Sequence, residues 1–175
     1  MSEPSTLQRL LTAPMRPGVL TWIGLRPARR QPMMSVDAAD VAPGIGLEGD
    51  HYTSSHNGPR QVTLIAAEDL SAIGGFLGGE APPQALRRNL VTRGLNIMSL
   101  KDRRFRIGQA VLEGAGECAP CGRMEETLGT GGYNAVRGHG GIVARVIEGG
   151  RIAIGDPIVR IDEDFTLILQ RRRAR

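Results

Sequence analysis

Short strand-like segments separated by glycines fill the middle of the chain, and they restrict its possible folds more than any other feature. Residues 105–112 and 152–159 share a pattern of strand, glycine-containing turn and strand, which is typical of a hairpin or of a sharply bent barrel strand. Further strand patterns lie at 18–23, 61–66, 90–92 and 140–147, which makes about seven short strands. The 24 glycines can supply the corners. We therefore predict a mainly β protein with a closed or partly open β-barrel, not a parallel sheet with alternating helices.

Two or three short helices accompany these strands. Apolar residues at helical spacing predict helices at 7–11, at 70–77 and at 124–128. Pro14 ends the first of them. Residues 43–50 are too rich in glycine for a regular element and are predicted to form a loop with positive φ angles.

The length of 175 residues predicts one domain, at 18–160, between an N-terminal extension (1–17) and a C-terminal extension (161–175). No run of about twenty apolar residues occurs, and the first residues do not resemble a signal peptide. We expect a cytoplasmic protein without a membrane partner. In that compartment a Cys-x-x-Cys pair stays reduced, and it is more often catalytic or metal-binding than structural.

Arginine carries almost all of the positive charge, because Lys101 is the only lysine and the net charge is +4. Arginine binds phosphate or carboxylate through two N–H groups at once, whereas lysine supplies the amine of Schiff-base chemistry. The bias argues against a pyridoxal enzyme. Aromatic residues make up 3% of the chain, too few for base stacking, so we expect no specific nucleic-acid partner. The basic run at 171–175 is interpreted as a solvated tail.

Both cysteines, Cys118 and Cys121, lie in one turn just before the helix predicted at 124–128. The free N–H groups and the dipole at a helix start favour a thiolate at Cys121, and Arg123 adds positive charge. Such a thiolate can attack an electrophile, exchange with a disulfide or bind a soft metal. Burial as a small apolar residue is the alternative, and for Cys118 the two readings are balanced.

Six motifs in a fixed order make the chain resemble the MOSC domain, named after the C-terminal domain of molybdenum cofactor sulfurase. The resemblance covers about residues 18–160. The motifs are Gly46-Leu47-Glu48-Gly49-Asp50-His51, Arg60-Gln61-Val62-Thr63-Leu64-Ile65, Arg87-Arg88-Asn89-Leu90-Val91, Phe105-x-Ile107-Gly108, Cys118-Ala119-Pro120-Cys121 and Gly149-Gly150-x-Ile152-x-x-Gly155-Asp156.

The resemblance implies a barrel-like fold that binds the molybdenum cofactor (molybdopterin) or carries sulfur for it. It makes Cys121 the candidate metal ligand or persulfide carrier, and it assigns the pterin phosphate to Arg87 and Asn89. Arg88 should point to the opposite face if this segment is extended. A surface salt bridge is the alternative for Arg87. Pyridoxal chemistry belongs to a separate domain of the full sulfurases, so we expect no pyridoxal phosphate in this chain.

Arg60 and three histidines complete the candidate residues. Arg60 opens a buried strand, where it could bind the pterin or a substrate, or pair with Asp50. His51 and His56 could each protonate a substrate near neutral pH, and His51 is the preferred catalytic candidate. His139, between two glycines, is interpreted as a turn residue.

Three functions remain open from the sequence. The first is a molybdenum-dependent oxidoreductase that reduces N-hydroxylated small molecules with electrons from a separate donor protein. The second is a carrier that accepts sulfur from a donor as a persulfide on Cys121 and has no redox turnover. The third is a thiol switch or zinc site at Cys118 and Cys121, which is disfavoured because a structural zinc needs four ligands.

Overall fold

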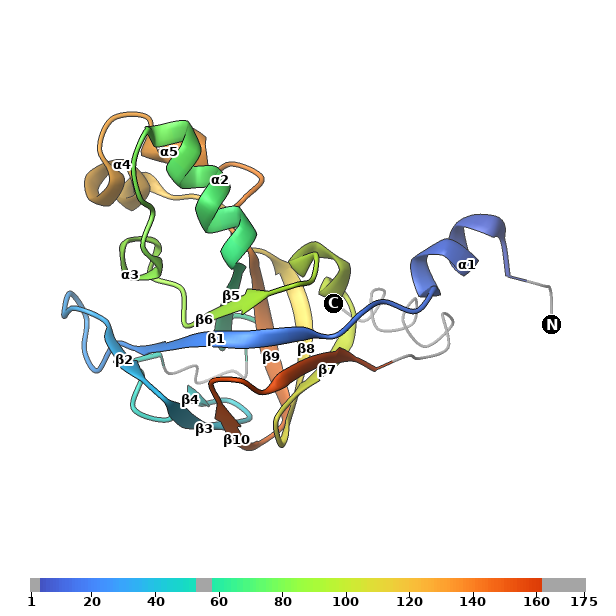
Figure 1. Cartoon of the computed structure of the whole chain (residues 1–175). Helices are drawn as coiled ribbons and strands as arrows, with labels where there is room; N and C mark the ends of the chain where they lie inside the picture. The colour runs from blue at the N-terminus through green and yellow to red at the C-terminus, as the bar shows by residue number, and fades with distance from the viewer. Residues whose placement is uncertain (1–3, 53–57, 162–175) are drawn as a thin grey trace.

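Seven strands close into a barrel in the computed structural model, which describes residues 4–52 and 58–161 (Figure 1). The order around the barrel is β11-β7-β8-β9-β5-β6-β1, and β1 closes the ring by pairing with β11, with Gly18 opposite Ile158. The strands are β1 (Gly18–Leu25), β5 (Val62–Ala66), β6 (Leu90–Arg93), β7 (Arg104–Ile107), β8 (Ala110–Glu117), β9 (Ile142–Glu148) and β11 (Pro157–Arg160). The prediction of a mainly β barrel is confirmed, and the barrel is closed.

One pair of neighbouring barrel strands, β5 and β6, runs parallel. A parallel pair needs a crossover connection, and here α2 (Ala67–Leu77) and α3 (Pro83–Leu86) form it. The crossover brings helices to the outside of the barrel next to β5 and β6. Figure 1 shows α2 grouped there with α4 (Gly122–Leu128) and α5 (Gly132–Val136).

A small sheet of β10 (Gly150–Ala153), β3 (Ala38–Ala42) and β4 (Gly46–Leu47) accompanies the barrel, and β2 (Met34–Val36) extends from the far end of β1. The two similar sequence segments therefore have different structures. Residues 105–112 form the β7–β8 hairpin, with Ile107 opposite Ala110. In residues 152–159 the hairpin alternative is wrong, because β10 pairs with β3 whereas β11 pairs with β7 and β1.

The elements that the sequence analysis missed are all short. They are β2, β3, β4, α3, α5 and a 3-10 helix, η1 (Ile97–Leu100), of two to five residues each. An element of this length shows neither a helical nor a strand period. The predicted helices are confirmed as α1 (Thr6–Thr12), α2 and α4. The loop predicted at 43–50 has three glycines with positive φ angles and contains β4.

Alternate residues of β5 and β6 face two separate apolar cores. Leu64 and Leu90 lie in the barrel core, together with fully buried Phe105. Ile65 and Val91 face outward and pack under the helices. Burying each such side chain contributes about 1.5–3 kcal/mol. Because the second core also contains Leu86 and Met124, α3 and the start of α4 are fixed beside the barrel.

The barrel begins at Gly18 and ends at Arg160, while the domain limits at 18 and 160 stay a prediction. No helix within the described ranges is long and apolar enough to cross a membrane. His56 and the basic run at 171–175 lie outside the described residues.

Candidate functional site

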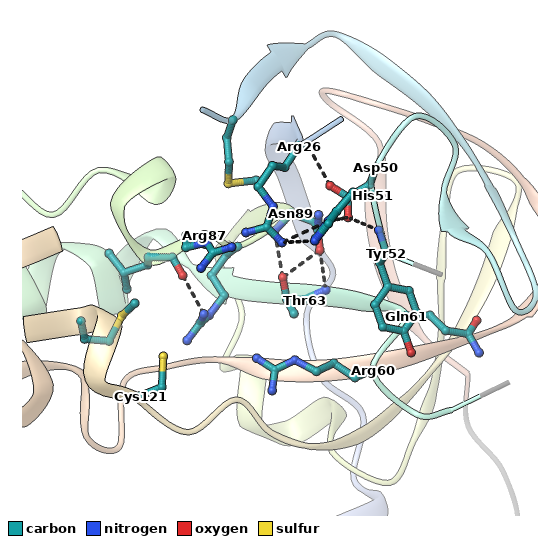
Figure 2. Close-up of a pocket in the computed structure, with 14 residues that line it drawn as sticks. Arg26, Asp50, His51, Tyr52, Arg60, Gln61, Thr63, Arg87, Asn89 and Cys121 are labelled. Carbon is teal, nitrogen blue, oxygen red and sulfur yellow. Dashed lines mark hydrogen bonds and ion pairs between the residues drawn. The ribbon is translucent and has the colours of Figure 1, made fainter. Parts of the chain in front are cut away.

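A cavity of about 190 Å³ lies between the barrel and the helices. Among the described residues that line it, four are arginines, one is a carboxylate and one is a cysteine. Figure 2 shows these side chains, which come from the ends of β1 and β4, from β5, from the α3–β6 turn and from α4. The lining residues are Arg26, Met33, Asp50, His51, Tyr52, Arg60, Gln61, Thr63, Leu86, Arg87, Arg88, Asn89, Cys121 and Met124. This cavity thus brings together the five residues that were predicted for the site: Cys121, His51, Arg60, Arg87 and Asn89.

Cys121 is the N-cap residue of α4 and is exposed. Its backbone carbonyl accepts a hydrogen bond from the N–H of Met124 at 2.8 Å, and its side chain makes no capping hydrogen bond. Met124 is buried in the core under the helices, so this bond fixes the backbone of Cys121. The thiol is therefore held on a rigid backbone at the cavity and is accessible to a ligand.

Cys118 has the opposite environment, because it is only 1% exposed. Its N–H donates to the carbonyl of Gly141 at 2.9 Å, and its Sγ accepts a hydrogen bond from Nη2 of Arg60 at 3.3 Å. Both cysteines are free. Within residues 4–52 and 58–161, no group of three or more histidine, cysteine, aspartate or glutamate side chains could hold a metal ion, which gives no support to a zinc site.

Arg87 and Arg88 both line the cavity, because the chain is not extended at this point. Arg87 ends α3 with a φ of 57°, in the left-handed region, and β6 begins only at Leu90. The condition for placing Arg88 on the opposite face is therefore not met. No hydrogen bond or ion pair of the Arg87 side chain occurs among the described residues, so its guanidinium is available for a ligand.

Arg88 is a buried cation that holds three chain segments together. Its Nε donates to the carbonyl of Gly140 at 2.8 Å, its Nη1 to that of Leu86 at 2.7 Å and its Nη2 to that of Cys118 at 3.3 Å. Burial lowers the pKa of Arg88; the neighbouring Cys118 opposes this change and the positive charge of Arg60 adds to it. All three acceptors are neutral carbonyls, so none of these bonds cancels the positive charge.

The side chain of Asn89 makes three hydrogen bonds within the protein. Its Oδ1 accepts from the N–H and the hydroxyl of Thr63, at 3.1 and 2.9 Å, and its Nδ2 donates to the carbonyl of Gly24 at 3.3 Å. The side chain thus joins β5, β6 and β1 next to the cavity. Its assignment to the pterin phosphate stays a prediction.

The carboxylate of Asp50 contacts three other residues that line the cavity. Its carboxylate accepts from the N–H of Arg26 at 2.7 Å and from the N–H of Tyr52 at 3.3 Å, and lies 3.9 Å from Nδ1 of His51. Burial raises the pKa of Asp50, and the hydrogen bond from Tyr52, the neighbouring His51 and a side-chain hydrogen bond from Asn89 oppose the rise. The alternative in which Arg60 pairs with Asp50 is wrong for the described residues, where Arg60 instead contacts Cys118.

His51 lies between a cation and an anion. Nη2 of Arg26 is 3.2 Å from Nδ1 and 3.3 Å from Nε2 of the ring. Nη2 of Arg26 is thus within hydrogen-bond distance of both ring nitrogens, and the tautomer of the imidazole decides which of them accepts. His139 does not line the cavity: its Nδ1 is 2.8 Å from Oδ1 of Asp69, on α2.

Two arginines of the site were missed by the sequence analysis. Arg26 directly follows β1, outside every element and motif predicted from the sequence. It contacts Asp50 and His51 from a distant part of the chain, so no local signal marks it. Arg88 could have been found only by noticing that the α3–β6 segment, which starts with Pro82 and Pro83, bends before the strand begins.

The cavity has hydrogen-bond donors that can bind an anionic group and a thiol that can bind a metal. Nε of Arg26 is buried without a hydrogen-bond partner, and the guanidinium of Arg87 has none among the described residues. An orphaned buried donor is costly unless a ligand satisfies it. Cys121 adds an accessible thiol, which is a good ligand for soft metals. The residues present therefore fit a metal cofactor with phosphate and sulfur groups.

The family model described as "MOSC domain" matches residues 51–159, which is more than half of the chain. The chain belongs to the MOSC domain family. This family is associated in general with binding of the molybdenum cofactor. The match includes the cavity residues from His51 to Met124 and leaves out Arg26, Met33 and Asp50.

Solved structures with the same fold share little sequence with this MOSC protein. The YuaD protein from Bacillus subtilis is 20% identical with a TM-score of 0.72, and the match covers 85% of this chain and 98% of that one. YiiM from Escherichia coli is 18% identical with a TM-score of 0.63, over 83% and 71%. YiiM from Geobacillus stearothermophilus is 16% identical with a TM-score of 0.67, over 83% and 75%. No curated protein matches the chain in sequence.

Proposed function

We propose that this MOSC protein binds the molybdenum cofactor in the cavity, with the Cys121 thiolate as the protein ligand to the metal, and reduces N-hydroxylated small molecules. The observation that carries the proposal is that one accessible thiol and four guanidinium groups line the same cavity, where the described lining includes a single carboxylate. Soft metals prefer sulfur ligands, and a phosphate is bound best by arginine forks.

Arg87, Asn89 and Arg60 have distinct parts in this proposal. Arg87 would bind the terminal phosphate of the pterin, because its guanidinium is not occupied by the protein. Asn89 would assist it or fix the strand that follows it. Arg60 would bind a second anionic group; in Figure 2 its guanidinium points to the side on which Cys121 lies. The bound cofactor would supply the two-electron chemistry that the side chains lack.

His51 is the proposed proton source. Reduction of an N-hydroxylated amine to the amine and water consumes two electrons and two protons, so the reaction needs both a proton donor and a separate electron-donor protein. His51 lines the cavity, and Arg26 and Asp50 hold its ring on two sides. An imidazole can exchange protons near neutral pH.

The decisive experiment is metal analysis of protein produced in cells that make the molybdenum cofactor. We expect molybdenum and pterin in the wild-type protein, and loss of molybdenum with a retained fold in Cys121→Ala. Glu126→Gln is the matched control, because Glu126 is on the same helix, is exposed and lies outside the cavity lining. Full molybdenum content in Cys121→Ala would remove this residue from the proposed site.

A sulfur carrier is the second candidate, and the exposure of Cys121 favours it. A persulfide must reach an acceptor on another molecule, which a thiol at the surface allows. Native mass spectrometry separates the two functions. A carrier would show one additional sulfur atom, lost in Cys121→Ala, and no stoichiometric molybdenum.

A further inference from the structure

Cys118 contacts two of the arginines that line the cavity, Arg60 and Arg88. Arg60 donates to its Sγ at 3.3 Å, and Arg88 donates to its carbonyl at 3.3 Å. The N–H of Cys118 is also bound, to the carbonyl of Gly141. Three hydrogen bonds thus fix a residue that is 1% exposed and lies three positions before Cys121. Its burial argues against direct contact with a substrate, so its part in the site must be indirect.

Among the described residues, Cys118 is the one that holds the Arg60 side chain by a hydrogen bond. Its contact with Sγ of Cys118 is the one hydrogen bond of the Arg60 side chain within residues 4–52 and 58–161. An arginine side chain loses about 2 kcal/mol of rotamer entropy when it is immobilised, and this cost is added to binding unless the side chain is already held. A fixed acceptor in the protein therefore prepares Arg60 for a ligand.

The acceptor is sulfur rather than a carboxylate, and this choice has an electrostatic consequence. A carboxylate would hold Arg60 more strongly, since charge-assisted hydrogen bonds are about twice as strong as neutral ones. It would also neutralise the guanidinium. A thiol, which carries no charge while it is protonated, would orient the same group and leave its positive charge for an anion in the cavity.

We propose that Cys118 is a positioning residue, whose Sγ orients the guanidinium of Arg60 toward an anionic ligand in the cavity without cancelling its charge. The identity of that ligand, the molybdenum cofactor, rests on the proposed function. The orientation of Arg60 does not, and it can be measured in the protein without cofactor.

The first test is nitrogen NMR of the arginine side chains in the cofactor-free protein. A hydrogen bond to Nη2 slows rotation about the Cζ–Nη bond of Arg60. We expect faster rotation in Cys118→Ala and slow rotation in Cys118→Ser, which keeps an acceptor at the same position. Arg60→Met assigns the resonance. Rotation that is the same in Cys118→Ala as in the wild type would overturn the proposal.

The second test is the amount of pterin retained by the purified protein, measured by fluorescence after release. Arg60→Met should lower retention by about tenfold to hundredfold, as expected for one hydrogen bond to a charged group, and Cys118→Ala should lower it by less. Because Cys118 acts through Arg60, the double variant should lose no more than the larger single loss. Fully additive losses would show that Cys118 acts independently of Arg60.

The variant Cys118→Asp tests the electrostatic part of the proposal separately from the orientation of Arg60. Its carboxylate would hold Arg60 and pair with Arg88, so we expect slow rotation of the Arg60 guanidinium and a melting temperature no lower than that of Cys118→Ser. Pterin retention should nevertheless fall to the level of Arg60→Met. Retention equal to that of Cys118→Ser would contradict the electrostatic part of the proposal. If the wild-type protein carries no pterin, the proposed function fails, and the NMR comparison alone decides the part played by Cys118.

Discussion

The imidazole of His139 is bound to the carboxylate of Asp69, with 2.8 Å between Nδ1 and Oδ1. This contact joins α2 to the glycine-rich turn before β9, and the ring of Phe76, also on α2, lies 5.4 Å from the imidazole ring. The same turn contains Gly140 and Gly141, whose carbonyls accept hydrogen bonds from Arg88 and from the N–H of Cys118. His139 therefore supports the cavity without lining it.

Removing this support should weaken the fold slightly. We expect His139→Ala to lower the free energy of unfolding by about 1 kcal/mol, the usual contribution of one side-chain hydrogen bond. Urea denaturation measures it. Asp69→Ala should cost a similar amount, and the double variant should cost little more than either. Independent, additive losses would show that the two side chains are not coupled.

Asn89 should contribute far more to stability, although it was predicted as a cofactor ligand. Asn89→Ala removes the acceptor of two buried Thr63 donors and the donor to Gly24. We expect a loss of about 2–4 kcal/mol in the free energy of unfolding of the cofactor-free protein. Thr63→Val is the control: it removes the hydroxyl that donates to Oδ1 of Asn89 and accepts from its N–H, but this N–H also donates to the carbonyl of Thr63, so the variant should cost less. A variant with unchanged stability but lost pterin would instead identify Asn89 purely as a ligand.

The barrel could be predicted from the sequence because its strands are marked by alternation and by glycine. On β7, Phe105 and Ile107 face the core while Arg104 and Arg106 face outward, which is the pattern that a sequence shows directly. The pairing of strands that are distant in the chain cannot be read from the residue pattern of either strand. The sequence of 152–159 is compatible with a hairpin, and only the presence of β3 and β7 decides that β10 and β11 enter different sheets.

Site residues could be predicted where the residue type alone indicates a function. They could not be predicted where their role depends on a contact between distant segments of the chain. Cys121 was found because a cysteine before a helix is visible in the sequence. The hydrogen bond between Arg60 and Cys118 joins residues 58 positions apart, so Asp50, much nearer in sequence, was the natural expected partner. Arg26 was missed for the same reason, since its contacts with Asp50 and His51 span 24 and 25 positions.

The raised pKa of Asp50 predicts a pH dependence of stability. Burial favours the protonated form, so between the ordinary carboxyl pKa of 3.8 and the higher folded value the folded state binds a proton that the unfolded state has lost. Stability from this group therefore falls as the pH rises through that window, and the penalty stays above it. Asp50→Asn keeps a side-chain acceptor for Arg26 and carries no charge. Its free energy of unfolding relative to the wild type should increase as the pH rises from 3.8 through this window.

Guanidinium denaturation at several pH values measures this difference. Asp40→Asn is the matched control, because Asp40 is exposed and is paired with Arg151 at the surface. The control should show no comparable increase. A difference between Asp50→Asn and the wild type that shrinks as the pH rises would mean that contacts with Arg26 and Tyr52 outweigh the cost of burial.

The turn before β9 offers a test of how closely the backbone is packed around the site. Gly141 has a φ of +78°, and a Cβ atom there would lie 2.0 Å from the carbonyl oxygen of Leu64 in β5. Gly138 has a similar φ of +79°, but nothing lies within 4 Å of its Cβ position. Gly138→Ala should therefore cost only the strain of the left-handed conformation, about 1–2 kcal/mol.

Gly141→Ala should cost clearly more than Gly138→Ala, because β9 must also move away from β5. The displacement would lengthen the bond from the N–H of Cys118 to the carbonyl of Gly141 and loosen the turn that holds Cys121. We expect a lower melting temperature and faster alkylation of Cys118, which is buried in the wild type. Thermal unfolding and mass-spectrometric labelling measure the two effects. Equal stability of the two glycine variants would contradict the close approach of β9 to β5.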